Sequence, residues 1–279
     1  MSRSKSIMKL PSIRRIYGIF LQEHYVHLHS VEGVFDIYIY SSISLILFGF
    51  LSKYLMSAGG GNAATQLAGT YLLIGMIFWE LVRIAQYTIS VDPMWNIWSR
   101  NLSNMFISPL RVSEYVIALA LTATVHALAL FICESIIARY VFGVDVFAVP
   151  LPYLLYAIVM LLWFSVSIGI FLFGLICKFG TRIQSFSWGI VPMLQPLTAA
   201  LFPVSSLPLP LQYVAYLLPT TYIFEMIRGS ISGSPGQLLQ NLAVYGFLVN
   251  IIWSIICIFV FRKLYGSSHA TGQFARNEA

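Results

Sequence analysis

The sequence predicts an all-α membrane protein with six transmembrane helices. The chain has 279 residues, of which 58% are hydrophobic and only 9% are charged, and its mean hydropathy is +0.81. Soluble domains carry about 25% charged residues. No polar block approaches the roughly 50 residues of a small globular domain, so we expect nearly the whole chain to lie within or against a membrane.

Six stretches have the roughly 20 mainly apolar residues that a helix needs to cross a bilayer. They are residues 34–54, 67–87, 115–142, 151–177, 183–202 and 238–261. The fifth stretch is the least regular, because Pro192 and Pro196 lie inside it and proline kinks a spanning helix. A seventh apolar stretch, residues 207–231, is broken by three prolines. We expect it to form a re-entrant external hairpin between spans five and six.

The positions of Lys and Arg favour six spans with both termini on the cytoplasmic side. That side would receive Arg3, Lys5, Lys9, Arg14, Arg15, Arg100, Arg111, Lys178, Arg182, Arg262, Lys263 and Arg276. The other side would receive only Lys53, Arg139 and Arg228. Positive residues gather in cytoplasmic loops, and a seventh span would weaken this asymmetry. The basic N-terminus is not followed closely by a cleavable apolar run, so we expect no signal peptide.

The expected organisation has three parts, in a bacterial-type cytoplasmic (inner) membrane. Residues 1–33 form a cytoplasmic tail with an interfacial helix, residues 34–262 the transmembrane domain, and residues 263–279 a second cytoplasmic tail. Within residues 12–21, apolar side chains gather on one helical face and Arg14 and Arg15 on the other. A helix of this kind lies flat in the head-group layer.

The cytoplasmic loop between spans two and three, residues 88–113, has the pattern of one short helix over about residues 92–108. Asp92 is suited to cap its N-terminus, and Pro93 fits the first helical position. Pro109 ends the helix, because proline disfavours helical geometry in the preceding residue. Trp95 and Trp98 begin an apolar stripe.

The polar residues Arg100, Asn101 and Asn104 fall outside that stripe, and Arg111 follows the terminating proline. Connections between helices usually take 2 to 8 residues, so a loop of this length requires an explanation. Two remain open: the helix rests on the lipid surface with its tryptophans as anchors, or it docks a soluble partner.

Two passages resemble a known family. "RNLSNMFISPLRVSEYV" looks like the cytoplasmic loop of type-2 ABC exporter permeases, where a polar helix precedes an "SPL" turn and a basic residue. "FPVSSLPLPLQYVAYLLPTTYIFEMIRG" resembles the region between spans five and six of that family, with Pro219, Tyr222, Glu225 and Arg228 at the matching positions.

The resemblance implies a function for both regions. The helix over residues 92–108 would be the coupling helix that fits a cleft on a separate ABC ATP-binding subunit. Its expected coupling residues are Asp92, Trp95, Trp98, Arg100, Asn101, Asn104, Pro109 and Arg111. The residues of the external hairpin, Pro219, Tyr222, Glu225 and Arg228, would form an outer gate.

The same resemblance implies an assembly of two copies of the chain, with two ATPases below and the path between the copies. The chain would bind no cofactor directly; ATP and Mg²⁺ would be held by the ATPase, since no GxxxxGK[ST] motif occurs here. Its substrate would be a glycan, a glycolipid or another amphipathic molecule, the alternative being a lipid or a drug. Membrane lipid is an expected partner and nucleic acid is not, because the net charge of +6 comes largely from the basic N-terminus.

Ionisable residues inside spans mark either paired charges or polar cavities. Glu80 and Arg83 are three positions apart in the second span, and Glu225 and Arg228 have the same spacing in the hairpin, so each pair can meet on one helical face. Each pair is expected to anchor local geometry or to serve the path.

Two other classes of protein remain as alternatives. A membrane-bound enzyme acting on lipid would need a cluster of His, Asp or Glu at the membrane edge, and only His24, His27 and His29 with Glu23 offer one. The same four residues are the one conceivable metal site. An ATP-independent channel or a structural membrane protein would have no ATPase partner.

Overall fold

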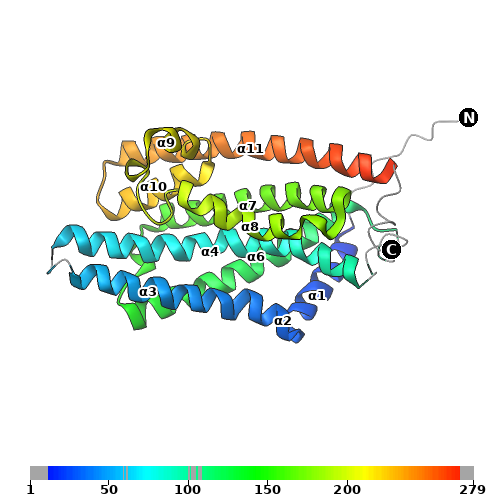
Figure 1. Cartoon of the computed structure of the whole chain (residues 1–279), viewed down its shortest axis with the longest axis horizontal. Coiled ribbons are helices and arrows are strands. Elements are labelled where there is room, and N and C mark those ends of the chain that lie inside the picture. Colours follow the sequence, from blue (N-terminus) through cyan, green and yellow to red (C-terminus); the bar gives the residue numbers. More distant parts are fainter. Residues whose placement is uncertain are drawn as a thin grey trace, which may run out of the picture.

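The computed structural model describes residues 12–58, 60, 62–99, 101, 105 and 109–270, and within them every regular element is helical. Figure 1 shows an elongated bundle whose long helices run side by side along its length. Five of them are long and apolar enough to cross a membrane. The chain is therefore a multi-pass membrane protein.

The first of these spans, Val31–Ala58, is built from α2 (Val31–Val34), a π-helical turn η1 (Phe35–Ile39) and α3 (Tyr40–Ala58). The second is α4 (Ala63–Trp98). The third joins α6 (Val112–Ile137) to a second π-helical turn, η2 (Ala138–Phe142). The remaining two are α7 (Leu151–Phe179) and α11 (Gly236–Ala270).

Helix α4 forms the centre of the bundle. In its most apolar stretch 72% of the residues are buried, against 22% for the first span and for α11. It packs against α3, α6 and α7. Because lipid offers no hydrophobic driving force, close packing of small residues holds such helices together. The apolar faces of α3 and α11 remain open to lipid or to another protein.

The prediction of a fifth span that forms one continuous helix is wrong. Residues 184–194 form α8 (Gln184–Leu194), an 11-residue helix, which gives way to a 3₁₀ turn, η5 (Gln195–Leu197). Ala199 then has a left-handed backbone with φ of 57°. Pro192 and Pro196 explain the break, since each lacks the N–H that a continuing helix requires.

This segment nevertheless follows the middle of α4 in the opposite direction. The Gln86 side chain donates a hydrogen bond to the carbonyl oxygen of Ser187 over 3.2 Å. Eleven residues earlier in α4, Gly75 lies directly against the backbone of Ala200. The chain thus passes along the central part of the bundle without forming a span of the usual length.

The Pro-rich stretch after this segment forms a pair of short helices. These are α9 (Leu209–Ala215) and α10 (Pro219–Ile231). The 3₁₀ turns η5 and η6 (Val204–Ser206) precede them. Both short helices lie at the end of the bundle where α3 and α4 are joined (Figure 1). Pro219 takes the first helical position of α10, where its missing N–H costs nothing.

Helix α1 (Ile13–His29) lies at the opposite end of the bundle and packs against α6. It is longer than the predicted 12–21 segment. Ile19, Glu23 and His27 face the protein, while Ile13 and Tyr17 are exposed. An outward apolar face at the end of a spanning bundle suits the expected interfacial position.

Gly75 provides a test of the packing between α4 and the irregular segment after α8. A Cβ atom at this position would lie 1.8 Å from the carbonyl oxygen of Ala200. Gly75→Ala is expected to destabilise the fold by about 1–3 kcal/mol, as overpacking does, and to lower the melting temperature of the detergent-solubilised protein. Gly189→Ala, whose Cβ would meet no heavy atom within 4 Å, is the control. Equal melting temperatures for the two variants would contradict the packing described.

Candidate functional site

The predicted start of the coupling helix at Asp92 is wrong, because this residue belongs to α4. Asp92 does not cap a new helix, and Pro93 does not begin one, because α4 continues through both residues to Trp98. A helix of 36 residues is about 54 Å long, whereas the hydrocarbon core is about 30 Å thick. The last turns of α4 therefore extend beyond the hydrocarbon at the α1 end of the bundle.

Trp95 and Trp98 occupy these last turns. Their rings lie 4.7 Å apart in an edge-to-face arrangement, and they are 41% and 38% exposed. They form a rigid aromatic surface next to the loop that follows α4. Tryptophan in this setting suits either a membrane interface or a protein contact.

Parts of the predicted coupling segment, including Arg100 and Asn104, lie outside the described residues. Asn101 is described: its backbone N–H donates to the carbonyl of Asn96 over 2.8 Å, and its carbonyl accepts from Met105 over 3.0 Å. Arg111 stands at the N-terminus of α6, where its backbone N–H donates to Glu114 over 3.0 Å. Pro109 lies in the bend just before this residue.

A buried cluster of polar side chains joins α1 to the end of α4. His27 of α1 lies 2.9 Å from Asp92, with Nε2 facing Oδ1, and both side chains are almost completely buried. Because a carboxylate only accepts hydrogen bonds, His27 donates. Asp92 is thus the partner of a histidine 65 positions away, and the sequence pattern did not reveal this contact.

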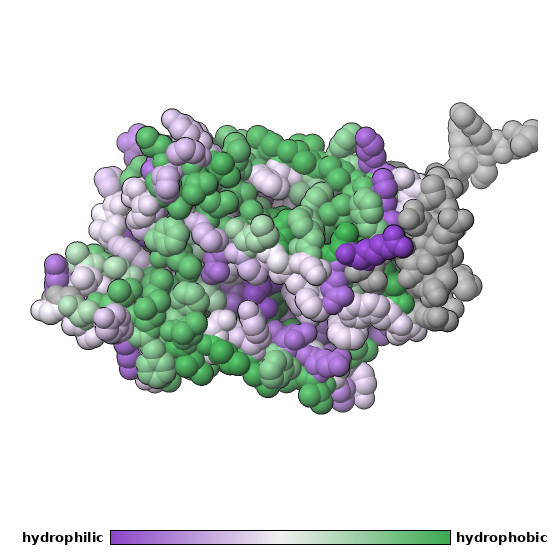
Figure 2. All heavy atoms as spheres, in the orientation of Figure 1, coloured by the Kyte–Doolittle hydropathy of each residue, from purple (hydrophilic) through white to green (hydrophobic). Residues whose placement is uncertain are grey.

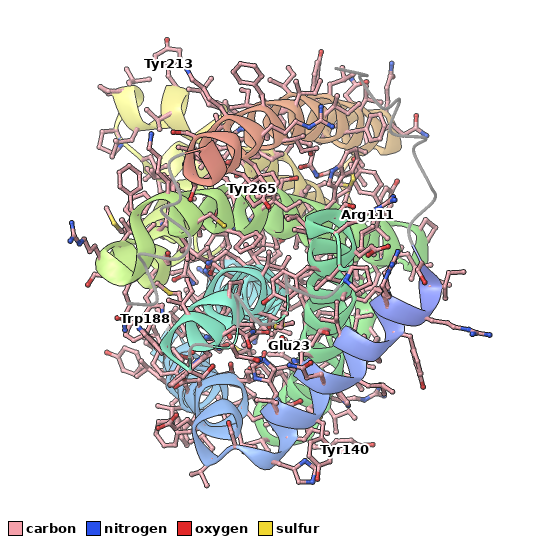
Figure 3. The ribbon with its side chains drawn as sticks, turned by 90° about the vertical axis from the view of Figure 1, so that its right-hand side faces the viewer. Glu23, Arg111, Tyr140, Trp188, Tyr213 and Tyr265 are labelled. Atoms are coloured by element: carbon pink, nitrogen blue, oxygen red, sulfur yellow. The ribbon has the colours of Figure 1, made fainter. Side chains whose placement is uncertain are left out.

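The same cluster reaches α6 through Asn96. Its side-chain amide lies 3.1 Å from Glu23 of α1 and 3.1 Å from the hydroxyl of Tyr115. His24 and His126 approach to 3.0 Å. Figure 3, which looks at the α1 end of the bundle, shows α1 crossing it obliquely and Glu23 pointing into the interior. Among the described residues, no group of three or more His, Cys, Asp or Glu is arranged to hold a metal ion.

Burial and like charge alter the titration of this cluster. Burial and the nearby carboxylate of Asp92 raise the pKa of Glu23 to about 8. Burial alone would lower the pKa of His27, but the charge of Asp92 and its hydrogen bond raise it above the ordinary value. Glu23 therefore holds a proton at neutral pH, and His27 carries positive charge more readily than a free histidine.

A second contact fixes the start of α1. The fully buried Glu114 accepts hydrogen bonds from the backbone N–H of Ser12 over 2.8 Å and from the guanidinium of Arg15 over 2.7 Å. Hydrogen bonds to an ionised acceptor are stronger than neutral ones. Both ends of α1 are thus tied to the bundle by polar contacts.

Two cavities flank this region, and they share one wall. The first has a volume of about 310 Å³ and lies between α1, α2, η1 and the end of α4. The second is a groove of about 260 Å³ between the first span, α4 and α8. Asp36 and Tyr87 line both, and the Tyr87 hydroxyl donates to Asp36 over 2.6 Å. Asp36 belongs to the π-helical turn η1, a kind of distortion that often marks functional sites.

Glu80 and Arg83 lie beside the groove and are paired, as their spacing predicts. Nε of Arg83 lies 2.7 Å from Glu80, and Ser41 of α3 donates to the same carboxylate over 2.9 Å. Arg83 also donates to Ser41 and stacks over Tyr40 at 5.1 Å. The groove is lined further by Gln86, Trp188 and Pro192.

The residues predicted for the external hairpin lie on α10. Glu225 and Arg228 are paired at 3.1 Å. Arg228 also donates to the carbonyl of Ala199 over 2.8 Å, and Glu225 accepts from the backbone of Val204 over 2.9 Å. The hydroxyl of Tyr222 donates to the carbonyl of Tyr216. The pair therefore holds α10 against the irregular segment that follows α8.

Comparison with known proteins points to one family. Residues 34–231 match the family model described as ABC-2 type transporter. The match begins within the first span and ends with α10. It includes the whole groove and the part of the first cavity that η1 and α4 line. No curated protein matches the chain significantly in sequence.

The α1 cluster is expected to make stability depend on pH. Glu23 has a folded pKa of about 8, above its ordinary value of 4.5, so the folded state binds a proton that the unfolded state releases between these values. Stability should therefore fall as pH rises from 4.5 to 8, and His27, whose pKa is also raised, acts in the same direction.

Thermal unfolding of the wild type and of Glu23→Gln between pH 5 and 9 measures this effect. Gln keeps an acceptor for Asn96 but cannot ionise, so the variant should show the weaker fall in melting temperature. The same pH dependence in both proteins would show that Glu23 does not titrate as described.

Proposed function

The chain belongs to the ABC-2 type transporter family and is a membrane-spanning permease, and we propose that two copies form the path of an ATP-driven exporter. Its substrate would be a glycan, a glycolipid or another amphipathic molecule. The observation that carries this proposal is the groove between the first span, α4 and α8. It places charged and aromatic side chains in the middle of a protein whose surface is otherwise suited to lipid.

The groove is difficult to reconcile with exposure to lipid. Arg83, Gln86 and Asp36 line it, and charged groups facing hydrocarbon are costly. Figure 2 shows hydrophilic side chains near the middle of this face, between hydrophobic surfaces, in addition to those at the two ends of the bundle. A second copy placed over this groove would enclose a polar path and remove these groups from lipid.

The lining of the groove favours a polar substrate with ring surfaces. Tyr40, Tyr87 and Trp188 provide aromatic faces, while Arg83 and Gln86 provide hydrogen-bond donors. Aromatic faces combined with a few placed polar groups are typical of sites that orient a ligand. This composition supports a glycan or glycolipid over a purely apolar substrate, the alternatives being a lipid or a drug.

The energy would come from a separate ATPase, which would hold ATP and Mg²⁺. Its docking surface would be the α1 end of the bundle, where the last turns of α4 extend beyond the hydrocarbon and expose Trp95 and Trp98. Helix α1 is joined to this end of α4 by the hydrogen bond between His27 and Asp92. Movement of this end would therefore pass directly into α4.

The orientation proposed puts the α1 end in the cytoplasm of a bacterial-type inner membrane. Arg14 and Arg15 of α1, Lys178 at the end of α7, and Arg262 and Lys263 near the end of α11 belong to this end. Excess positive charge marks the cytoplasmic side. The hairpin of α9 and α10 would then face outward and serve as the outer gate.

Cross-linking between copies tests the path. Trp188 is 46% exposed at the groove, and in Figure 3 it lies on the opposite side from Arg111, where α6 begins. In a Cys133→Ser background, which removes the exposed native cysteine, Trp188→Cys should give cross-linked dimers in membranes with a short bifunctional thiol reagent. Val125→Cys on α6, which is 41% exposed, should give few. Equal cross-linking, or more from Val125→Cys, would contradict the proposed pairing.

Coupling is tested in the loop after α4. Charge reversal at Arg100 (Arg100→Glu), or Asn101→Pro, which removes the backbone N–H that donates to Asn96, is expected to abolish substrate-coupled ATP hydrolysis by the assembled transporter while leaving its size-exclusion profile unchanged. Gly18→Ala on α1, where a Cβ would meet no heavy atom within 4 Å, is the control. Normal transport by both loop variants would show that this loop does not couple the ATPase to the spans.

A further inference from the structure

The 310 Å³ cavity at the α1 end has an unusual charge composition. The whole chain contains 10 Asp and Glu residues and 16 Lys and Arg residues. Four of the acids, Glu23, Glu32, Asp36 and Asp92, line this one cavity, and no Lys or Arg of the described residues does. Four of the ten acidic residues of a basic protein thus line a single cavity.

The carboxylates of this cavity are close enough to act together. Glu23 and Asp92 interact electrostatically, and the imidazole of His27 responds to Glu23, Asp36 and Asp92. His27 is the only basic side chain of the described residues in the lining, and it faces Asp92 alone at hydrogen-bond distance. Even with His27 charged, the acids outnumber the bases.

One carboxylate oxygen of Asp92 lacks a hydrogen-bond partner among the described residues. Its residue is 1% exposed, Oδ1 faces His27, and Oδ2 has no hydrogen-bond partner among the described residues. A buried acceptor left unsatisfied costs about 1–3 kcal/mol. Such an atom in the wall of a cavity indicates a ligand that supplies a donor or a positive charge.

The rest of the lining fits an organic cation. Trp95 and Tyr87 are aromatic residues in the lining of the cavity, and aromatic rings attract ammonium groups. The volume lies at the small end of ligand pockets, which begin at roughly 300 Å³. We propose that this cavity binds an ammonium group, supplied either by the head of an amphiphile in the adjacent membrane or by a small soluble cation.

This site is separate from the groove, although Asp36 and Tyr87 form a wall common to both. In the groove the charge of Asp36 is balanced by Arg83, whereas the acids of the cavity outnumber its bases. The proposal therefore assigns the cavity its own ligand and does not depend on which substrate the groove carries.

Proton release provides a specific signature. Glu23 is protonated at neutral pH in the empty cavity, because burial and Asp92 raise its pKa to about 8. The groups that face it are His27 on its own helix, Asp92 and Asn96 on α4, and Tyr115 on α6. A bound cation stabilises the ionised carboxylate, so binding at pH 7 should expel a proton from Glu23.

Calorimetry of the full-length protein in lipid-free detergent tests the proposal, with choline as the probe. Choline should bind saturably, and its uncharged isostere 3,3-dimethylbutan-1-ol should not. Titrations in two buffers of different ionisation enthalpy should show proton release for the wild type and less for Glu23→Gln.

Charge-removing variants locate the site. Glu23→Gln and Asp92→Asn should each weaken choline binding by about tenfold, the loss of one charge interaction of roughly 1.4 kcal/mol. Asp145→Asn removes the same charge from an exposed ion pair with Arg139, outside the cavity lining, and should change affinity by less than about twofold. The comparison of choline with its isostere remains informative even if a variant fails to fold.

Three results would overturn the proposal. The first is equal binding of choline and the isostere, and the second is choline binding that neither Glu23→Gln nor Asp92→Asn weakens. The third is binding seen only after Arg100→Ala, which would show that the chain's own arginine fills the cavity. Nanodiscs then separate the two sources of the ammonium group. Weaker choline binding in phosphatidylethanolamine than in phosphatidylglycerol identifies the lipid head group as the ligand, and equal binding identifies a soluble cation.

Discussion

A charged side chain on a membrane-spanning helix needs a partner on a neighbouring element, and this requirement organises the structure. Helix α4 carries Glu80, Arg83 and Asp92 through the centre of the bundle. The first two pair with each other and with Ser41 of α3, and Asp92 pairs with His27 of α1. Unpaired, each charge would be costly in hydrocarbon. These contacts therefore determine which faces of α1 and α3 lie against α4.

The same contacts give α4 two different environments along its length. Near its middle, the polar groups open sideways into the groove, where the proposed path would run. Near its end, they open into the acidic cavity beside α1. The hydrogen bond between Tyr87 and Asp36 lies at the boundary between the groove and the cavity. Asp36 belongs to the π-helical turn of the first span. Under the proposed function, a shift of the α4 end by the ATPase would act on both sites through one continuous helix.

Hydropathy predicts those parts of the fold that depend on local composition. It locates the spans that became α3, α4, α6, α7 and α11, and the spacing of Glu80 and Arg83 predicts their pairing. It fails where packing overrides local signals. Asp92 and Pro93 have the pattern of a helix start, yet tertiary contacts carry α4 through them, and prolines shorten the fifth predicted span to α8. The contact between His24 and His126 joins residues 102 positions apart, and no local pattern encodes such a pairing.

Under the proposed function, this permease works only with a separate ATPase. Gentle affinity purification from native membranes, followed by mass spectrometry of the co-purifying chains, tests it most directly. We expect a stoichiometric partner that carries a GxxxxGK[ST] motif and is lost when the loop after α4 is altered. A protein that purifies alone as a uniform oligomer, and with which no ATP-binding chain can be reconstituted, would contradict it. Trp95 and Trp98 would then be better explained as lipid anchors.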